Sequence, residues 1–154
     1  IIQIEKDQIK APNLVNLLSN DKILKLFHFG RFDIAILFST FGVITSPVYC
    51  TKIASKIART YTNRHRLKNL LSEILDVDIS KQQQSSDWGA KHLSKAQIEY
   101  AATDVLYLHA LREKLNEMLT RENRSELANE CFKFLPSRAV LDIKGWNEID
   151  IFEH

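Results

Sequence analysis

The chain has 154 residues, enough for one domain that buries a core without disulfides or a structural metal. Hydrophobic residues make up 45% of it and charged residues 26%, as in an ordinary soluble globular protein. No apolar run approaches the roughly 20 residues that a membrane span needs, so the composition excludes a membrane-spanning class and predicts no membrane partner.

The cysteines and the charge point to an intracellular protein of no special class. Cys50 and Cys131 form no CxxC pair and no signal peptide is recognisable, so we expect buried, unreactive thiols and a cytoplasmic location. The net charge of +2 is too small to establish nucleic-acid binding. The locally basic middle of the chain contains Lys52, Lys56, Arg59, Arg64, Arg66 and Lys68. A solvated helix face explains such a run equally well.

The first third of the chain predicts a strand, a helix and a second strand. Residues 1–4 and 23–29 are short apolar runs rich in β-forming residues. Residues 11–18 between them predict a short helix, with Pro12 in its first turn.

The next segments alternate in the same way. Residues 32–41 are apolar on nearly all sides, which predicts a buried helix, and Gly42 follows where a helix typically ends. Residues 48–50 predict a third strand. Ile53 and Ile57 lie one turn apart on the following helix, and residues 67–75 have the spacing of an amphipathic helix.

The rest of the chain is predicted to be mostly helical. Ser94 and Gln97 form a capping box, and one apolar face follows them, which predicts a long helix to about Glu122. Residues 126–134 predict a second helix. Residues 136–154 are irregular in pattern but rich in apolar side chains, so we expect this tail to dock on the domain or on a partner chain.

One loop stands out. Residues 80–92 are polar and lack both helical and strand periodicity, which indicates either a functional loop or a plain surface connection. The chain shows no internal repeat and no second domain, so residues 1–154 are interpreted as a single domain.

Two aspartates and a tyrosine are candidates for a catalytic or metal-binding role. Tyr100 and Asp104 are four residues apart on the long helix, hence on one face. Asp is unfavourable inside a helix, and a bound cation would remove the cost of an unpaired charge there. Asp33 falls in the first turn of a helix directly after the strand 23–29, at the end of a strand where α/β folds keep their sites.

Each of these residues also has a plain structural explanation. The helix dipole stabilises an aspartate in a first turn by roughly 0.3–1 kcal/mol, which suffices for Asp33. Asp104 could pair with Arg112 or another arginine. Tyr100 could be a core residue with a satisfied hydroxyl.

Three segments in order resemble one family of nucleases. Residues 28–33, His-Phe-Gly-Arg-Phe-Asp, resemble the second exonuclease motif of the DEDD nucleases. Residues 100–108 resemble the third motif in its tyrosine form, Y-x-x-x-D. Between them, Lys81, Ser86-Asp87-Trp88, Leu93-Ser94 and Gln97 are similar to the K…SDW…LS…Q…YAA stretch of ribonuclease D.

The resemblance implies a fold, a cofactor and roles for single residues. It implies an α/β, ribonuclease H-like 3′→5′ exonuclease fold, with a mixed sheet flanked by helices and the first strands absent from this chain. Two divalent cations, Mg²⁺ or Mn²⁺, would be held by four carboxylates, with Asp33 and Asp104 as ligands. Tyr100 would position the attacking water. The residues implied in handling the RNA end are His28, Phe32, Lys81 and Trp88.

The family's first motif, D-x-E, supplies the other two ligands and has no counterpart here. Glu5-Lys6-Asp7 has the reverse order, and Ile1–Ile4 matches the family's third strand. We therefore expect the natural protein to have upstream residues. In the alternatives, Ile1–Ile4 takes the place of the missing strand or another chain donates one.

The resulting hypothesis is a 3′→5′ exoribonuclease that degrades single-stranded RNA or the 3′ ends of tRNA and other structured-RNA precursors to nucleoside 5′-monophosphates. A non-catalytic nucleic-acid-binding module and a 3′→5′ DNA exonuclease are the alternatives, and a homo-oligomer is left open. RNA and DNA substrates differ at the ribose 2′-hydroxyl, which these motifs do not read.

Overall fold

The computed structural model describes residues 1–4, 10–79, 83 and 85–153. Its helices are α1 (Pro12–Ser19), α2 (Arg31–Phe41), α3 (Thr51–Ala58), α4 (Leu67–Leu75), α5 (Lys95–Leu106), α6 (Leu108–Arg121) and α7 (Ser125–Leu141), followed by a short π-helical segment, η1 (Asp142–Trp146). The strands are β1 (Lys25–Phe27) and β2 (Val48–Cys50). Among these elements, no helix is long and apolar enough to cross a membrane.

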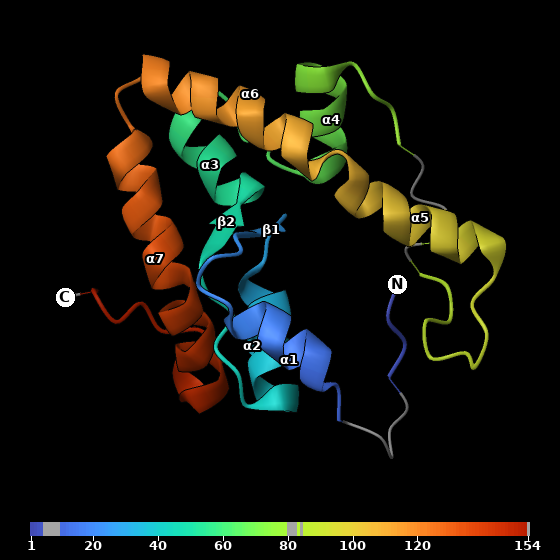
Figure 1. The fold of residues 1–154 in the computed structure, drawn as a ribbon. Coiled ribbons are helices and arrows are strands. Elements are labelled where there is room, and N and C mark those ends of the chain that lie inside the picture. The colour runs from blue at the N-terminus through green and yellow to red at the C-terminus, as the bar shows by residue number, and fades with distance from the viewer. Residues whose placement is uncertain (5–9, 80–82, 84, 154) are drawn as a thin grey trace.

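The two strands lie at the centre of the molecule and pair in parallel (Figure 1). Lys25 pairs with Val48 and Phe27 with Cys50, so the carboxyl ends of both strands meet at one edge. Gly30 follows β1 at a close approach, because a Cβ there would lie 2.5 Å from the Cβ of Phe27. This glycine lets the chain turn directly from β1 into α2.

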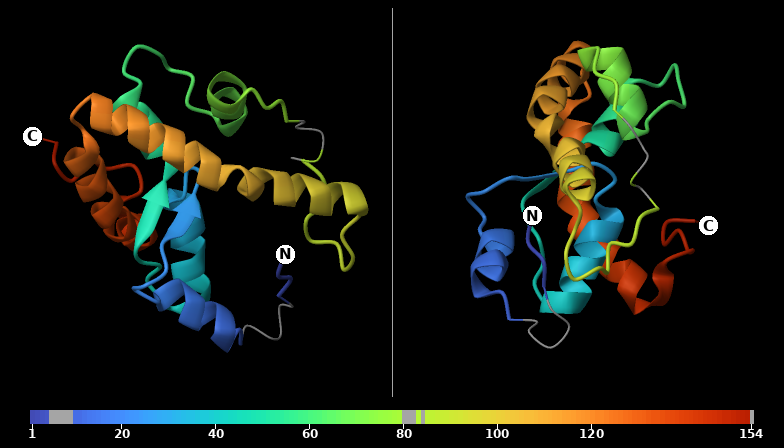
Figure 2. Two further views of the ribbon diagram at one scale, coloured as in Figure 1. Left: turned by 45° about the horizontal axis from the view of Figure 1, so that its top comes forward. Right: turned by 90° about the vertical axis from the view of Figure 1, so that its right-hand side faces the viewer.

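Helix α6 carries the main apolar ridge. Leu108, Leu111, Leu115 and Leu119 recur at helical spacing and are all buried. The ridge packs against α3, α4 and β1, while α7 covers β2 and α2. Figure 2 shows α5 and α6 nearly end to end, with α5 reaching beyond the rest of the body.

The structure confirms most of the predicted elements. The helix beginning at Pro12, the strands before and after α2, and α3 and α4 lie where the patterns place them. Gly42 ends α2 with a left-handed φ of 66°. Ser94 and Gln97 form the predicted capping box at the start of α5.

Residues 1–4 were expected to form a strand, and this prediction is wrong. The segment is irregular, because a strand needs a neighbour for its backbone groups and no described strand lies beside it. The described sheet is accordingly parallel rather than mixed.

Three further predictions need correction. The long helix 94–122 is broken at Tyr107, whose φ and ψ of −93° and −2° end α5. The tail is not irregular throughout, because α7 continues through the buried Pro136 to Leu141. Helix α2 is not buried on all sides, since Phe32 is 57% and Ile36 64% exposed.

A smaller correction concerns the cysteines. Cys50 is buried as predicted, whereas Cys131 is half-buried.

Arg31 in α2 binds Asp142 through two hydrogen bonds of 2.6 Å and donates another to the Asn147 carbonyl. These bonds hold the C-terminal segment against α2.

Replacing Leu111 tests the importance of the α6 ridge. We expect Leu111→Ala to lower the free energy of unfolding by about 2–5 kcal/mol, because it leaves a cavity in the core. Leu127→Ala, at an exposed position of α7, is the matched control and should change it by less than about 0.5 kcal/mol. Urea unfolding of the three proteins measures both values, and equal losses would contradict the assigned core.

Candidate functional site

A cavity of about 750 Å³ opens at the carboxyl edge of the sheet. It is lined by residues that follow β1, by the first residues of α3 and α4, and by one face of α5. Asp33, Tyr100 and Asp104 all line it, so residues far apart in the sequence share one space. The three candidate residues thus border the same cavity.

The two aspartates stand on separate helices. Asp33 lies in the first turn of α2, and Asp104 lies in the last turn of α5. Desolvation raises the pKa of both carboxyls above their usual value. Two desolvated carboxylates facing one cavity are a favourable place for a cation, which would lower these pKa values again.

Tyr100 lies one helical turn before Asp104 and lines the same cavity. Its pKa is raised by desolvation and by the neighbouring Asp104, so the hydroxyl keeps its proton at neutral pH. The Trp88 ring packs against it, with ring centroids 6.0 Å apart. Tyr100 is therefore suited to orienting a water molecule rather than to removing a proton from it.

His28 also lines the cavity, and its hydrogen bonds determine its protonation. The Thr51 hydroxyl donates to the Phe27 carbonyl at 3.2 Å and lies 2.9 Å from His28 Nδ1. Since the hydroxyl has one proton, both bonds form only if Nδ1 carries a hydrogen and Nε2 is an acceptor. Desolvation, followed by the charge of Lys52, lowers the pKa of His28 to about 4, which keeps the ring neutral.

Part of the cavity lining is basic. Lys52, Arg66 and Lys68 line it, and none of them forms an ion pair within the described part of the chain. The site thus has an acidic side suited to cations and a basic side suited to phosphates.

The described residues hold only part of a metal site. No group of three or more His, Cys, Asp or Glu side chains that could bind a metal ion occurs in residues 1–4, 10–79, 83 and 85–153. The carboxylates of Asp33 and Asp104 are suited to be two of the ligands of a divalent ion, because they are oxygen donors and because desolvation raises their pKa values. A complete set needs donors from elsewhere.

The other predicted site residues lie at different distances from this cavity. His28 lines it, whereas Phe32 and Trp88 do not line it but pack against Phe29 and Tyr100, which do. Lys81 lies outside the described residues. Their roles stay predictions.

Sequence reasoning missed Phe29, Thr51 and the local role of Lys52. Lys52 had a signal, since it belongs to the basic run in the middle of the chain. Thr51 and Phe29 had only their positions directly after or near the ends of strands.

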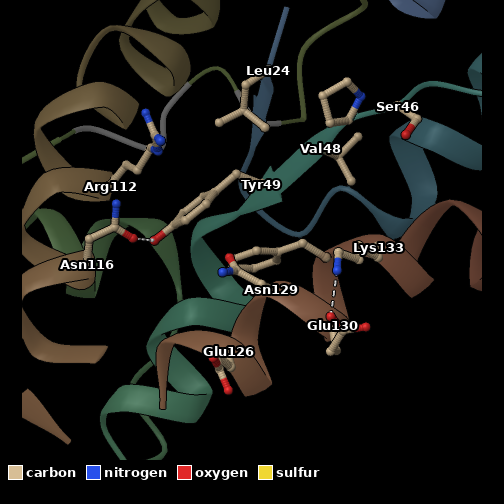
Figure 3. A pocket seen from close by; sticks show the side chains of 12 residues that line it. Leu24, Ser46, Val48, Tyr49, Arg112, Asn116, Glu126, Asn129, Glu130 and Lys133 are labelled. Atoms are coloured by element: carbon tan, nitrogen blue, oxygen red, sulfur yellow. Dashed lines mark hydrogen bonds and ion pairs between the residues drawn. The ribbon is translucent and has the colours of Figure 1, made fainter. Parts of the chain in front are cut away.

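A second cavity, of about 560 Å³, lies at the amino ends of the strands, away from both aspartates (Figure 3). Arg112 of α6 lies over the Tyr49 ring there, and Tyr49 donates to Asn116 at 3.0 Å. Arg112 therefore does not pair with Asp104, which was one of the arginine pairings that a plain structural explanation allowed. Glu130 and Lys133 neutralise each other at 2.6 Å, and nothing in this cavity resembles a catalytic group set.

The chain is similar to several known proteins. A model of the 3′-5′ exonuclease family matches residues 2–120. The ribonuclease D of Acidiphilium cryptum (strain JF-5) is 34% identical over 130 residues, which are 84% of this chain and 33% of the relative. The chain spans about a third of the length of the curated relatives that it matches.

Solved structures match the fold as well. A structure of Brucella melitensis NrnC has a TM-score of 0.95 and 62% identity, and covers 99% of this chain and 74% of that one. The same protein has been solved with bound Mg²⁺ and bound to pGG. The crystal structure of Escherichia coli RNase D, an exoribonuclease involved in structured RNA processing, has a TM-score of 0.76 and 25% identity over 88% of this chain and 37% of its own. The ribonuclease H-like exonuclease fold implied by the motifs is confirmed.

The half-buried, neutral His28 predicts a pH dependence of stability. Its folded-state pKa of about 4 lies below the ordinary 6.5, so the unfolded chain binds a proton that the folded chain resists. The contribution is present above pH 6.5 and falls as the pH drops from 6.5 toward 4. We expect His28→Asn to lose this dependence. Urea unfolding between pH 7 and pH 5 measures it, and parallel curves for the two proteins would contradict the neutral state.

Proposed function

Because the chain belongs to the 3′-5′ exonuclease family, we propose that the protein containing it is a metal-dependent 3′→5′ exoribonuclease. It hydrolyses phosphodiester bonds from the 3′ end of RNA and releases nucleoside 5′-monophosphates. The observation that carries the proposal is the meeting of Asp33, Tyr100 and Asp104 in one cavity at the carboxyl edge of the sheet.

Divalent cations, when bound, supply the activation of water and the stabilisation of the leaving 3′ oxygen. Asp33 and Asp104 would hold them from two helices. The other two ligands of the family's set, the D-x-E pair, would come from elsewhere in the whole protein or from a partner chain. The Mg²⁺-bound structure of Brucella melitensis NrnC supports Mg²⁺ as the cation.

The residues of this chain orient the reactants around that centre. The protonated Tyr100 hydroxyl orients the attacking water through one hydrogen bond, in line with its raised pKa. His28 offers an unprotonated Nε2 to a hydroxyl of the terminal nucleotide. The basic side chains that line the cavity take the phosphates.

The substrate class is proposed from the relatives. The ribonuclease D names and the pGG ligand of Brucella melitensis NrnC support RNA, with short oligonucleotides among the substrates. Precursors of tRNA and other structured RNAs are the longer substrates that the Escherichia coli relative suggests.

Removing one carboxylate tests the chemistry. We expect Asp104→Asn to lower the rate of degradation of a 5′-labelled single-stranded RNA by at least about two orders of magnitude in Mn²⁺, because a metal ligand is lost. Asp76→Asn, at an exposed left-handed position that asparagine tolerates, is the control and should keep full activity.

The wild type should give a ladder from the 3′ end that a chelator abolishes. RNA binding by the intact wild-type protein without any chelator-sensitive cleavage would overturn the enzyme proposal and support the non-catalytic module.

Competition between matched RNA and DNA strands tests the sugar preference. We expect the RNA strand to be degraded first, because the unprotonated Nε2 of His28 can accept a hydrogen bond from a ribose hydroxyl. The measurement is the ratio of kcat/KM values for the two strands in one reaction. A preference for DNA would support the DNA exonuclease instead.

A further inference from the structure

We propose that Gln97 is a positioning residue for the reaction: its side-chain amide attaches residues 86–88 to α5 and thereby keeps the Trp88 ring against Tyr100. The inference rests on the proposed function, in which Tyr100 orients the attacking water. It assigns to Gln97 a role beyond that of a helix cap.

The Gln97 side chain is buried and fully hydrogen-bonded. It lies in the first turn of α5 and is only 6% exposed. Its Nε2 donates to the Asp87 carbonyl at 2.9 Å and to the Ser86 hydroxyl at 3.1 Å. Its Oε1 accepts from the Ser94 backbone N–H at 2.8 Å. Both amide hydrogens and the amide oxygen are therefore engaged, as a buried polar group requires.

These partners explain why an amide stands at this position. The Ser94 N–H can meet only an oxygen and the Asp87 carbonyl can meet only a donor, so the amide has one possible orientation. A capping box works with either glutamate or glutamine at its third helical position. The Asp87 carbonyl needs the NH2 group, because a carboxylate has no hydrogen to donate. The bond to the loop therefore requires glutamine, whereas the helix cap does not.

The bond to Asp87 acts on the peptide that leads directly into Trp88. The Asp87 carbonyl and the Trp88 N–H belong to one planar peptide unit, so fixing the carbonyl restricts the position of the Trp88 side chain. The Trp88 ring packs against Tyr100, with ring centroids 6.0 Å apart. Gln97, Tyr100 and Asp104 follow the i, i+3, i+7 spacing of one helix face. The attachment point of the loop and the candidate catalytic residues of α5 therefore share that face.

The attachment of this loop to α5 depends on Gln97. Among the described residues, the hydrogen bonds that join residues 85–89 to α5 all come from its side chain. The Ser86 hydroxyl accepts from Gln97 and donates its own hydrogen to the Gln83 carbonyl at 2.8 Å, so the attached segment is also ordered internally. The Trp88 side chain is exposed, and the hydrophobic core therefore does not hold it in place.

Three substitutions separate the attachment of the loop from the helix cap. Gln97→Glu keeps an oxygen for the Ser94 N–H and removes both donors to the loop. Gln97→Met removes the same donors without adding a charge. Ser94→Ala is the matched control, because it removes the hydroxyl that accepts from the Gln97 backbone N–H at 3.2 Å and leaves the bonds to the loop. All are made in the intact protein.

Hydrogen exchange measured by mass spectrometry reports the attachment without any reaction. We expect faster exchange of residues 85–92 in Gln97→Glu and Gln97→Met, because the loop loses its hydrogen bonds to α5. In Ser94→Ala the exchange of residues 85–92 should stay unchanged, while residues 95–100 exchange faster because the helix has lost half of its cap.

The rate of RNA degradation in Mn²⁺ reports the positioning role. We expect Gln97→Glu and Gln97→Met to lower kcat about tenfold and to change KM by less than about twofold, because a displaced Tyr100 affects the reacting geometry more than binding. Ser94→Ala should keep kcat within about twofold while its Tm falls. In a Tyr100→Phe background, Gln97→Glu should lower kcat no further, because Gln97 acts through the Tyr100 hydroxyl.

The outcomes that contradict the proposal are distinct. Unchanged exchange of residues 85–92 in Gln97→Glu would overturn the attachment, and faster exchange with unchanged kcat would overturn the positioning role. A further loss of kcat in the Tyr100→Phe background would show that Gln97 does not act through Tyr100. Failure of the proposed function would instead appear as no chelator-sensitive cleavage by the wild type, and hydrogen exchange would still decide whether Gln97 holds the loop.

Discussion

The parallel pairing of β1 with β2 is the constraint on which the site depends. Because both strands end at the same edge, residues that follow them, namely Phe29, Asp33 and Lys52, line one cavity. The Thr51 hydroxyl ties the two ends together by bonding the Phe27 carbonyl and the His28 ring. The two-stranded sheet can thus fix the positions of the residues at both strand ends, since the residue after β2 is hydrogen-bonded to the end of β1.

The site also depends on how α6 positions α5. The buried leucines of α6 fix this helix on α3 and α4, and α5 continues from it past the body of the molecule. Tyr100 and Asp104 are therefore placed by packing that lies one helix away. The break at Tyr107 sets the direction in which α5 leaves α6, and with it the approach of Asp104 to Asp33.

Acidic and basic side chains are unpaired within the site, whereas several arginines elsewhere are paired. Carboxylates and basic side chains line the same cavity without pairing, whereas arginines elsewhere bind acidic partners. Asp142 accepts from Arg31, and Arg138 donates to the Trp146 carbonyl at 3.0 Å, so the C-terminal segment braces the helix that carries Asp33. Unpaired charge is costly in a fold, and it is retained here where metal ions and phosphates would bind.

Periodicity and capping in the sequence determined the helices, the two strands and the facing of Tyr100 and Asp104, because these depend on neighbours within a few residues. The family resemblance, rather than a local pattern, singled out Asp33 and Asp104, and the structure places both at one cavity. Tertiary structure alone decided that Ile1–Ile4 forms no strand, because pairing needs a neighbour in space. It also decided that Arg112 lies on Tyr49 and that the Phe29 ring holds Lys52, since contacts between residues 23 or more apart leave no periodic trace in a sequence.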